Sequence, residues 1–193
     1  MLLEHTPATD AGVVKTLAES GCFIGAKAGL HELAFGITSN NAVTGPILNP
    51  HDKTLIPGGS SGGTAAAIAS GIFPAGLGTD TGGSCRIPAA LCGIIGFRPT
   101  TGRYAGDGIV PISHTRDTVG PLARSMRDII LLDQVLSVET AEIEKADLSR
   151  FTLGVPRQVF YDTVDPHVTN TVEAQLLNLS AQGAKLVDVN FDG

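Results

Sequence analysis

Two short segments of glycine and serine constrain this chain more than any other feature. They are Gly58–Gly63 (GGSSGG) and Gly82–Ser84 (GGS). A stretch of high helix propensity and a short apolar stretch, typical of a buried strand, separate them. Ser60 and Ser84 are 24 residues apart, enough for a helix in one direction and a strand back. We therefore expect the two segments to meet at one side of a sheet.

The second segment has the composition of an oxyanion-binding turn. Gly82 and Gly83 leave consecutive backbone N–H groups uncovered just before Ser84, and such donors stabilise the charge that develops during acyl transfer. A serine hydroxyl is a weak nucleophile without a base. The structural alternative is that the glycines permit close packing of a helix on a strand and the serines cap helices. On these residues alone, both interpretations stay open.

Other glycine motifs fit less well. Gly58–Gly62 matches the G-x-S-x-G pattern of an α/β-hydrolase, but the preceding segment HDKTLIP is polar and ends in proline rather than forming a hydrophobic strand. Neither a P-loop nor a dinucleotide-binding motif is complete around these glycines. An esterase that uses Ser60 as nucleophile and His114 or His167 as base is kept as an alternative.

The apolar pattern predicts an α/β fold. Residues 151–193 read as strand, helix and strand, a βαβ-like segment, so we expect a mostly parallel sheet. One core is the default for 193 residues. Further elements are predicted as helices at 11–21, 30–35, 64–70 and 125–136 and as strands at 22–26 and 73–79.

Composition and charge exclude several classes of function. Hydrophobic residues make up 42% of the chain, too many for a disordered protein. The net charge of −6 opposes binding to nucleic acid by charge attraction. No apolar stretch approaches the roughly 18 residues of a membrane span, and the first ten residues lack the pattern of a signal peptide. We expect a cytoplasmic protein without membrane or nucleic-acid partners.

The three cysteines indicate neither disulfides nor a metal site. Cys22, Cys85 and Cys92 form no CxxC pair and have no histidine at zinc-ligand spacing. We expect reduced, buried thiols, no metal and no cofactor.

Several ordered motifs are similar to those of the amidase signature family. They are Gly58–Ala66 (GGSSGGTAA), Gly78–Pro88 (GTDTGGSCRIP), Cys92–Thr100 (CGIIGFRPT) and Asp117–Leu122 (DTVGPL). The resemblance implies an α/β amidase signature fold, with a mixed, largely parallel sheet between helices. It also implies hydrolysis of a carboxylic amide through an acyl-enzyme on serine. Residues 1–193 are then a partial amidase domain, with core motifs at 36–125 and the βαβ-like segment at 151–193.

The resemblance implies roles for individual residues. Ser84 corresponds to the nucleophile and Ser60 to a bridging serine, whose peptide bond with Gly59 is expected in the cis form. The oxyanion hole corresponds to the backbone amides of Thr81, Gly82, Gly83 and Ser84. The supporting residues are Ser61, Asp80 and Arg86, the last two as an ion pair.

The family's third catalytic residue is a lysine, and it lies further upstream than this chain extends. Lys15 falls on the polar face of a predicted helix, and Lys27 matches a non-catalytic family position, so neither replaces it. We therefore expect an incomplete fold, with no amidase activity in the isolated chain. The expected partners are a small-molecule amide, a second copy of the chain or a complementary amidase segment.

Two loop segments narrow the substrate class. Residues 31–41 and 108–120 resemble amidases of arylalkyl amides more than the transamidating subunit of glutamyl-tRNA amidotransferase. The alternatives are that transamidating subunit, or a catalytically inactive fragment or accessory chain. The candidate substrate-binding residues are His31, Phe35, Thr38 and His114.

Overall fold

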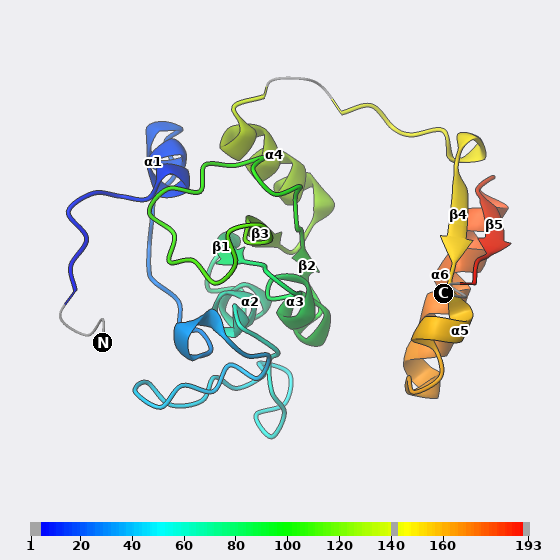
Figure 1. Ribbon diagram of the computed structural model, residues 1–193, viewed down its shortest axis with the longest axis horizontal. Coiled ribbons are helices and arrows are strands. Elements are labelled where there is room, and N and C mark those ends of the chain that lie inside the picture. The colour runs from blue at the N-terminus through cyan, green and yellow to red at the C-terminus, as the bar shows by residue number, and fades with distance from the viewer. Residues whose placement is uncertain (1–4, 140–142, 191–193) are drawn as a thin grey trace. The chain divides into compact units, whose positions relative to one another are not determined.

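The computed structural model describes residues 5–139 and 143–190. The chain forms two compact units, Met1–Ala141 and Glu142–Gly193, drawn in Figure 1. The elements of the first unit are α1 (Gly12–Glu19), the 3₁₀ helix η1 (Glu32–Ala34), α2 (Gly62–Ala69), β1 (Ala75–Thr79), α3 (Arg86–Cys92), β2 (Ile95–Gly96), β3 (Val119–Ala123) and α4 (Met126–Ser137).

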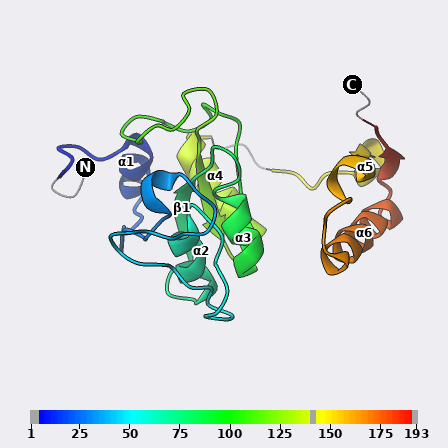
Figure 2. The same ribbon diagram turned by 60° about the horizontal axis from the view of Figure 1, so that its bottom comes forward.

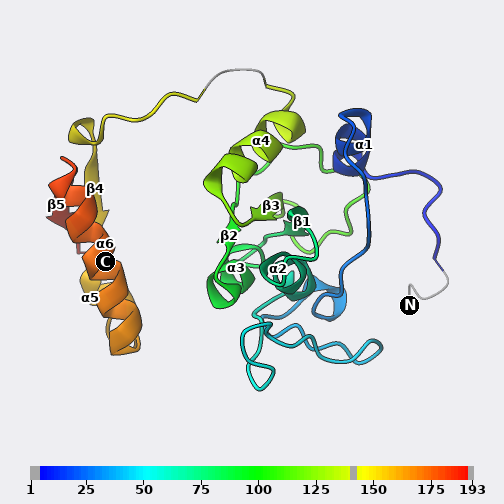
Figure 3. The ribbon, with the colours of Figure 1, turned by 180° about the vertical axis from the view of Figure 1, so that it is seen from behind.

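A three-stranded sheet organises the first unit, in the order β1-β3-β2. Because β3 is antiparallel to both neighbours, β1 and β2 run in the same direction. Helices α2 and α3 cover one face, and α4 with α1 covers the other, as the opposite views in Figures 1 and 3 show. All five residues of β3 are buried, because this strand lies between two helical layers.

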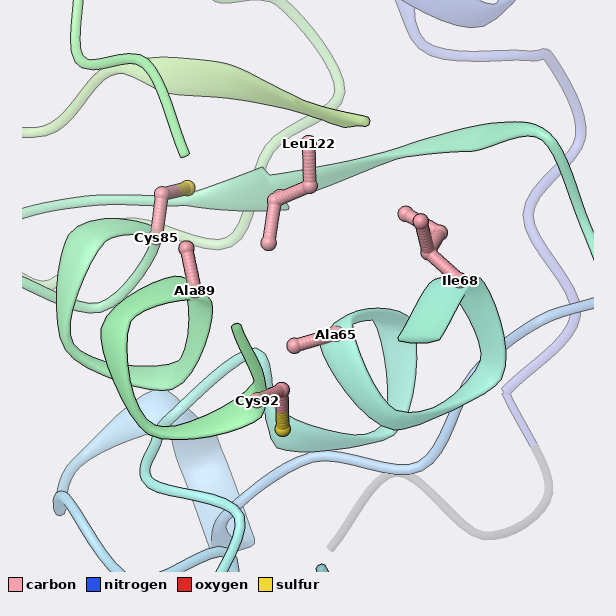
Figure 4. Close-up of a cluster of buried hydrophobic side chains, with 6 residues drawn as sticks. All are labelled: Ala65, Ile68, Cys85, Ala89, Cys92 and Leu122. Atoms are coloured by element: carbon pink, nitrogen blue, oxygen red, sulfur yellow. The ribbon is translucent and has the colours of Figure 1, made fainter. Parts of the chain in front are cut away.

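The first core lies between β3 and the pair α2 and α3, which run side by side in Figure 2. Figure 4 shows its buried side chains, which are Ala65, Ile68, Cys85, Ala89, Cys92 and Leu122. Most of them are small, so the helices approach the sheet closely. A Cβ at Gly96 would lie 2.7 Å from the Ala89 side chain, which shows that β2 has no room for a side chain there. The glycine-rich composition thus serves close packing.

The second core lies on the opposite face of the sheet. Its buried residues are Val13, Leu17, Tyr104, Val119 and Leu136. Side chains alternate along a strand, so Val119 faces this core while Leu122 faces the other. Polar contacts close its edge: Asp133 on α4 accepts hydrogen bonds from Tyr104 Oη at 2.5 Å and from Arg103 at 2.8 Å.

The second unit is a strand–helix–strand arrangement, as its sequence pattern predicts. Strands β4 (Thr152–Val155) and β5 (Lys185–Asp188) pair in parallel. The Asp165 side chain accepts from the His167 N–H at 2.8 Å and caps α6 (Pro166–Ala181). Arg157 forms an ion pair with Glu173 of this helix at 2.7 Å. The elements are the 3₁₀ helix η2 (Leu148–Arg150), β4 (Thr152–Val155), α5 (Arg157–Phe160), α6 (Pro166–Ala181) and β5 (Lys185–Asp188).

The α/β class is confirmed, but several local predictions are wrong. Cys22–Ala26 is not a strand: no described residue pairs with it, and Phe23 is 91% exposed. An apolar segment forms a β-strand only where a neighbouring strand pairs with it. Cys22 is therefore exposed, whereas Cys85 and Cys92 are buried. The helix expected at 30–35 is a single 3₁₀ turn, with positive φ at two of its residues.

The expectation of a mostly parallel sheet does not hold in the first unit, where both described strand pairs are antiparallel. β1, α3 and β2 do form a parallel strand–helix–strand path, but β3 returns between the two strands. Neither α3 nor β3 was predicted. Pro121 argues against a central strand because proline lacks an N–H. Pro88 argues against a helix in the same way, but it lies in the first turn of α3, where proline is tolerated.

None of the helices in residues 5–139 and 143–190 has the length and apolar character that a membrane crossing requires.

Replacing Leu122 with alanine tests the role of β3. The side chain is 0% exposed, so Leu122→Ala is expected to lower the free energy of unfolding by about 2–5 kcal/mol. Leu131→Ala on α4 is the control, because Leu131 is 60% exposed and the expected change is below about 0.5 kcal/mol. Urea unfolding followed by circular dichroism measures both, and equal effects would contradict the assignment of the core.

Candidate active site

The two glycine-serine segments meet beside the end of β1. Ser61 forms the N-cap of α2, and its backbone N–H donates to the Ser84 carbonyl at 3.2 Å. The Ser61 hydroxyl also donates to the Thr79 carbonyl at 3.4 Å and accepts from the Thr79 N–H at 3.3 Å. The helix and strand between the two segments therefore return the chain as their spacing predicts.

The loop before α2 has an unusual backbone held by a buried serine. The Gly59–Ser60 peptide bond is cis, as the family resemblance predicts. Ser39 is 0% exposed; its hydroxyl donates to the Gly58 carbonyl at 2.6 Å and accepts from the Gly62 N–H at 3.1 Å. Sequence reasoning missed Ser39, since only the folded loop brings it to the glycines.

Ser60 is buried beside a cavity. Its Oγ is the one buried side-chain nitrogen or oxygen atom in the described part of the chain that has no hydrogen-bond partner. A buried hydroxyl in this state costs free energy unless a ligand, water or another chain segment satisfies it. Ser60 lines a cavity of about 250 Å³, whose apolar wall is formed by Val13, Val14, Leu77, Ile109 and Val119.

Asp80 is the electrostatic centre of the turn that carries Ser84. The carboxylate is completely buried and accepts from the backbone N–H groups of Gly83 at 2.8 Å and Cys85 at 3.1 Å. Arg86 contacts both carboxylate oxygens at 3.1 Å, and Arg98 approaches to 3.4 Å. Burial alone would raise the pKa of Asp80, but Arg86 and the backbone donors hold it below its ordinary value. The expected ion pair with Arg86 is present, and Arg98 is an additional partner.

The turn offers fewer free amides than the sequence suggests. The Gly83 N–H is bonded to Asp80, because the buried carboxylate needs donors. Within residues 5–139 and 143–190, the N–H groups of Thr81, Gly82 and Ser84 have no intramolecular acceptor. These three donors remain available to a ligand beside the half-buried Ser84.

The four substrate-binding candidates do not gather in one cavity. His31 Nδ1 lies 3.3 Å from Thr38 Oγ1, and the His31 N–H donates to the Ser60 carbonyl at 3.0 Å. Phe35 is 77% exposed. His114 lines a second cavity of about 240 Å³ together with Tyr104, Ile109, Pro111, Asp117 and Thr118.

Cys85 is not a competing nucleophile, although it follows Ser84. Its Sγ points into the first core and lies 3.6 Å from the Gly120 carbonyl oxygen. Burial and the nearby Asp80 carboxylate raise the pKa of the Cys85 thiol to about 12. The thiol is therefore protonated at neutral pH, and only a thiolate is an effective nucleophile.

No described lysine serves Ser60 as a base. Lys15 lies on α1, 3.8 Å from Glu19, and both side chains are exposed. Lys27 is also exposed, and Ser60 Oγ receives no hydrogen bond from either. The described residues contain no group of three or more His, Cys, Asp or Glu side chains that can hold a metal ion.

A family model described as Amidase matches residues 1–192. This chain belongs to the amidase family. The amidase chain is 46% identical over 190 residues to indoleacetamide hydrolase of Rhizobium radiobacter, covering 98% of this chain and 41% of the relative. It is 44% identical over 196 residues to mandelamide hydrolase of Pseudomonas putida, covering 98% of this chain and 38% of the relative.

The fold comparison agrees with the family. A crystal structure of an amidase superposes with a TM-score of 0.87 at 40% sequence identity, covering 94% of this chain and 41% of that chain. The amidase chain thus spans about two fifths of the length of the proteins it matches.

Asp80→Asn tests the electrostatic centre. Asparagine carries no charge and has one acceptor oxygen instead of two, so the hydrogen bonds from Gly83, Cys85 and Arg86 weaken. Because the Arg86 side chain is 53% exposed, water solvates the charge that loses its partner. We therefore expect the free energy of unfolding at pH 7 to fall by about 2 kcal/mol. Folding lowers the pKa of Asp80. The ionised carboxylate therefore stabilises the folded state above the ordinary aspartate pKa of about 4, and this stabilisation is lost as the pH falls towards the folded-state pKa. The difference between wild type and variant should therefore shrink below about pH 4.

Denaturant unfolding at several pH values measures this difference. Asp107→Asn is the matched control, since Asp107 is exposed and its substitution should leave the unfolding midpoint nearly unchanged. A difference that stays constant down to pH 2 would contradict an ionised Asp80.

Proposed function

We propose that this chain carries the catalytic serines of an amidase that hydrolyses a small carboxylic amide to the acid and ammonia. The observation that carries the proposal is the meeting of Ser61 with Ser84 beside a turn with three free backbone amides. Family membership supports the same reaction class.

In the proposed reaction, Ser84 Oγ attacks the amide carbonyl and a C–O bond forms. The carbonyl oxygen becomes negative and is stabilised by the free N–H groups of Thr81, Gly82 and Ser84. The proton from Ser84 passes to the departing nitrogen, the C–N bond breaks, and ammonia leaves. Water then attacks the acyl-enzyme, which releases the acid and restores the Ser84 hydroxyl.

Ser60 is proposed to relay the proton between Ser84 and a lysine outside these 193 residues. A hydroxyl that bridges two groups needs two partners, and the buried Ser60 Oγ has no hydrogen-bond partner within the described residues, so it is open to both. It faces a cavity with an apolar wall, and an apolar surrounding favours the neutral amine that a lysine base requires. An esterase with Ser60 as nucleophile is disfavoured, because no described histidine is hydrogen-bonded to its hydroxyl.

The proposed substrate is an arylalkyl amide. Indoleacetamide and mandelamide, which the names of two relatives specify, both attach an aromatic group to a short carboxamide. The proposed binding residues remain His31, Phe35, Thr38 and His114. Residues 1–193 are proposed as part of one amidase domain.

A transamidating role is the second candidate, because the relatives also include one of the subunits of a glutamyl-tRNA(Gln) amidotransferase. Glutamine would then be the ammonia donor. Ammonia release from glutamine, compared with release from indoleacetamide, distinguishes the two candidates.

Ser84→Ala tests the nucleophile in the protein at its natural length. We expect turnover to fall by at least about a thousandfold, since removal of a catalytic serine leaves only binding and oxyanion stabilisation. Ammonia release measures turnover, and circular dichroism checks that the fold is retained. Ser70→Ala, at an exposed serine after α2, should keep full activity. Undiminished turnover in Ser84→Ala would refute the assignment.

The isolated chain of 193 residues gives a separate prediction. Without the lysine it should release no ammonia above background, even where circular dichroism shows folded protein. Sustained, Ser84-dependent hydrolysis by this chain alone would show that the base lies within it.

A further inference from the structure

The oxyanion turn is joined to the residues before β3 by an extension of the strand pairing. Thr79 pairs with Val119 at the last position of the β1–β3 ladder. One residue further, the Asp80 N–H donates to the Thr118 carbonyl at 2.8 Å. The same register places Asp117 opposite Thr81, and Thr81 Oγ1 donates to Asp117 Oδ1 at 2.5 Å.

The second oxygen of Asp117 holds a different segment. Its Oδ2 accepts from the backbone N–H groups of Ile112 at 2.6 Å and Ser113 at 2.9 Å. The Asp117 N–H donates in turn to the Ser113 carbonyl at 3.0 Å. A single carboxylate thus connects the turn that carries Ser84 to the loop of residues 109–117.

That loop forms one wall of the cavity of about 240 Å³. Ile109, Pro111 and His114 line it from the loop, and Tyr104 lines it from the preceding segment. The lining also includes the polar residues Asp117 and Thr118, and small-molecule sites combine apolar surface with such polar groups. Any shift of the loop changes this cavity.

Asp117 carries a charge at neutral pH. Burial opposes ionisation, but hydrogen bonds from Thr81, Ile112 and Ser113 outweigh it and hold the pKa of Asp117 below its ordinary value. Hydrogen bonds to a charged acceptor are shorter and stronger than those between neutral groups, so the connection between turn and loop is stiff.

We propose that Asp117 is a positioning residue that couples the shape of the cavity at residues 109–117 to the geometry of the oxyanion turn. It acts through Thr81, whose backbone N–H is one of the three free donors. It also fixes the loop that forms one wall of this cavity, and the proposal places the acyl group of the substrate there. This inference rests on the proposed amidase function.

The coupling follows from the number of acceptors. Asparagine has the shape of aspartate but replaces one acceptor oxygen with an NH₂ donor and carries no charge. With its oxygen towards the loop, its NH₂ group can only donate to the Thr81 hydroxyl, so the hydrogen bond from Thr81 to a charged acceptor is lost. Thr81→Val keeps the shape of the side chain and removes only its hydroxyl. Thr81→Ser retains the hydroxyl and serves as the conservative variant.

The test uses Asp117→Asn, Thr81→Val, their combination, Thr81→Ser and the exposed control Asp107→Asn, in the protein at its natural length. For each, kcat and KM are measured with indoleacetamide and with acetamide. Asp117→Asn and Thr81→Val are expected to lower kcat by about tenfold or more for both amides. This loss is smaller than that caused by removing one oxyanion donor completely, because the Thr81 N–H is displaced and not removed. Asp107→Asn should stay within about threefold of wild type, well short of that loss. Thr81→Ser keeps the hydroxyl and should recover most of the kcat that Thr81→Val loses.

Two readouts separate coupling from a structural role. The combined variant should have the kcat of Asp117→Asn alone, because both substitutions remove the same donation from Thr81 Oγ1 to the Asp117 carboxylate. The preference in kcat/KM for indoleacetamide over acetamide should fall in Asp117→Asn and persist in Thr81→Val, since only Asp117 holds the loop. Additive losses in the combined variant, or unchanged kcat and preference in Asp117→Asn, would overturn the proposal.

The result is separable from the proposed function itself. If Ser84→Ala remains active, the amidase assignment to Ser84 fails. If Ser84→Ala is inactive and Asp117→Asn behaves as wild type, only the coupling fails.

Discussion

The first unit depends on one buried charge. A carboxylate without solvent is costly unless donors surround it, and Asp80 receives two backbone N–H groups and two arginines. These contacts curve the chain around the carboxylate directly after β1. The curvature orients Ser84 and leaves the neighbouring amides of Thr81 and Gly82 free. The same demand for donors removes the Gly83 amide from the set available to a ligand.

Strand β3 links this turn to the rest of the unit. It lies between β1 and β2, and its alternate side chains enter the two cores. Because β3 is antiparallel to β1, the residues before it reach the turn that follows β1. Thr118 and Asp117 therefore hold the turn in addition to Ser61, which precedes α2. The candidate site thus depends on the register of a single strand pair.

The sequence predicted those helices and strands whose formation depends on residues close together in the chain. The spacing of the serine segments predicted their meeting, Ser125 and Asp165 cap α4 and α6, and the strand–helix–strand pattern of the second unit is present. Prediction failed where a partner distant in sequence decides the structure. Cys22–Ala26 lacks a strand partner among the described residues, and β3 forms despite Pro121 because its two neighbours supply the pairing.

The sequence by itself determined the family, the two serine segments, the need for small residues beside the helices and the cis peptide bond implied by the resemblance. Only the tertiary structure decided which groups satisfy Asp80, which amides of the turn stay free, and that Ser39, Arg98 and Asp117 support the site. The reason is physical: a buried polar group accepts whichever donors the fold brings within about 3 Å. Such partners come from segments that no local pattern connects.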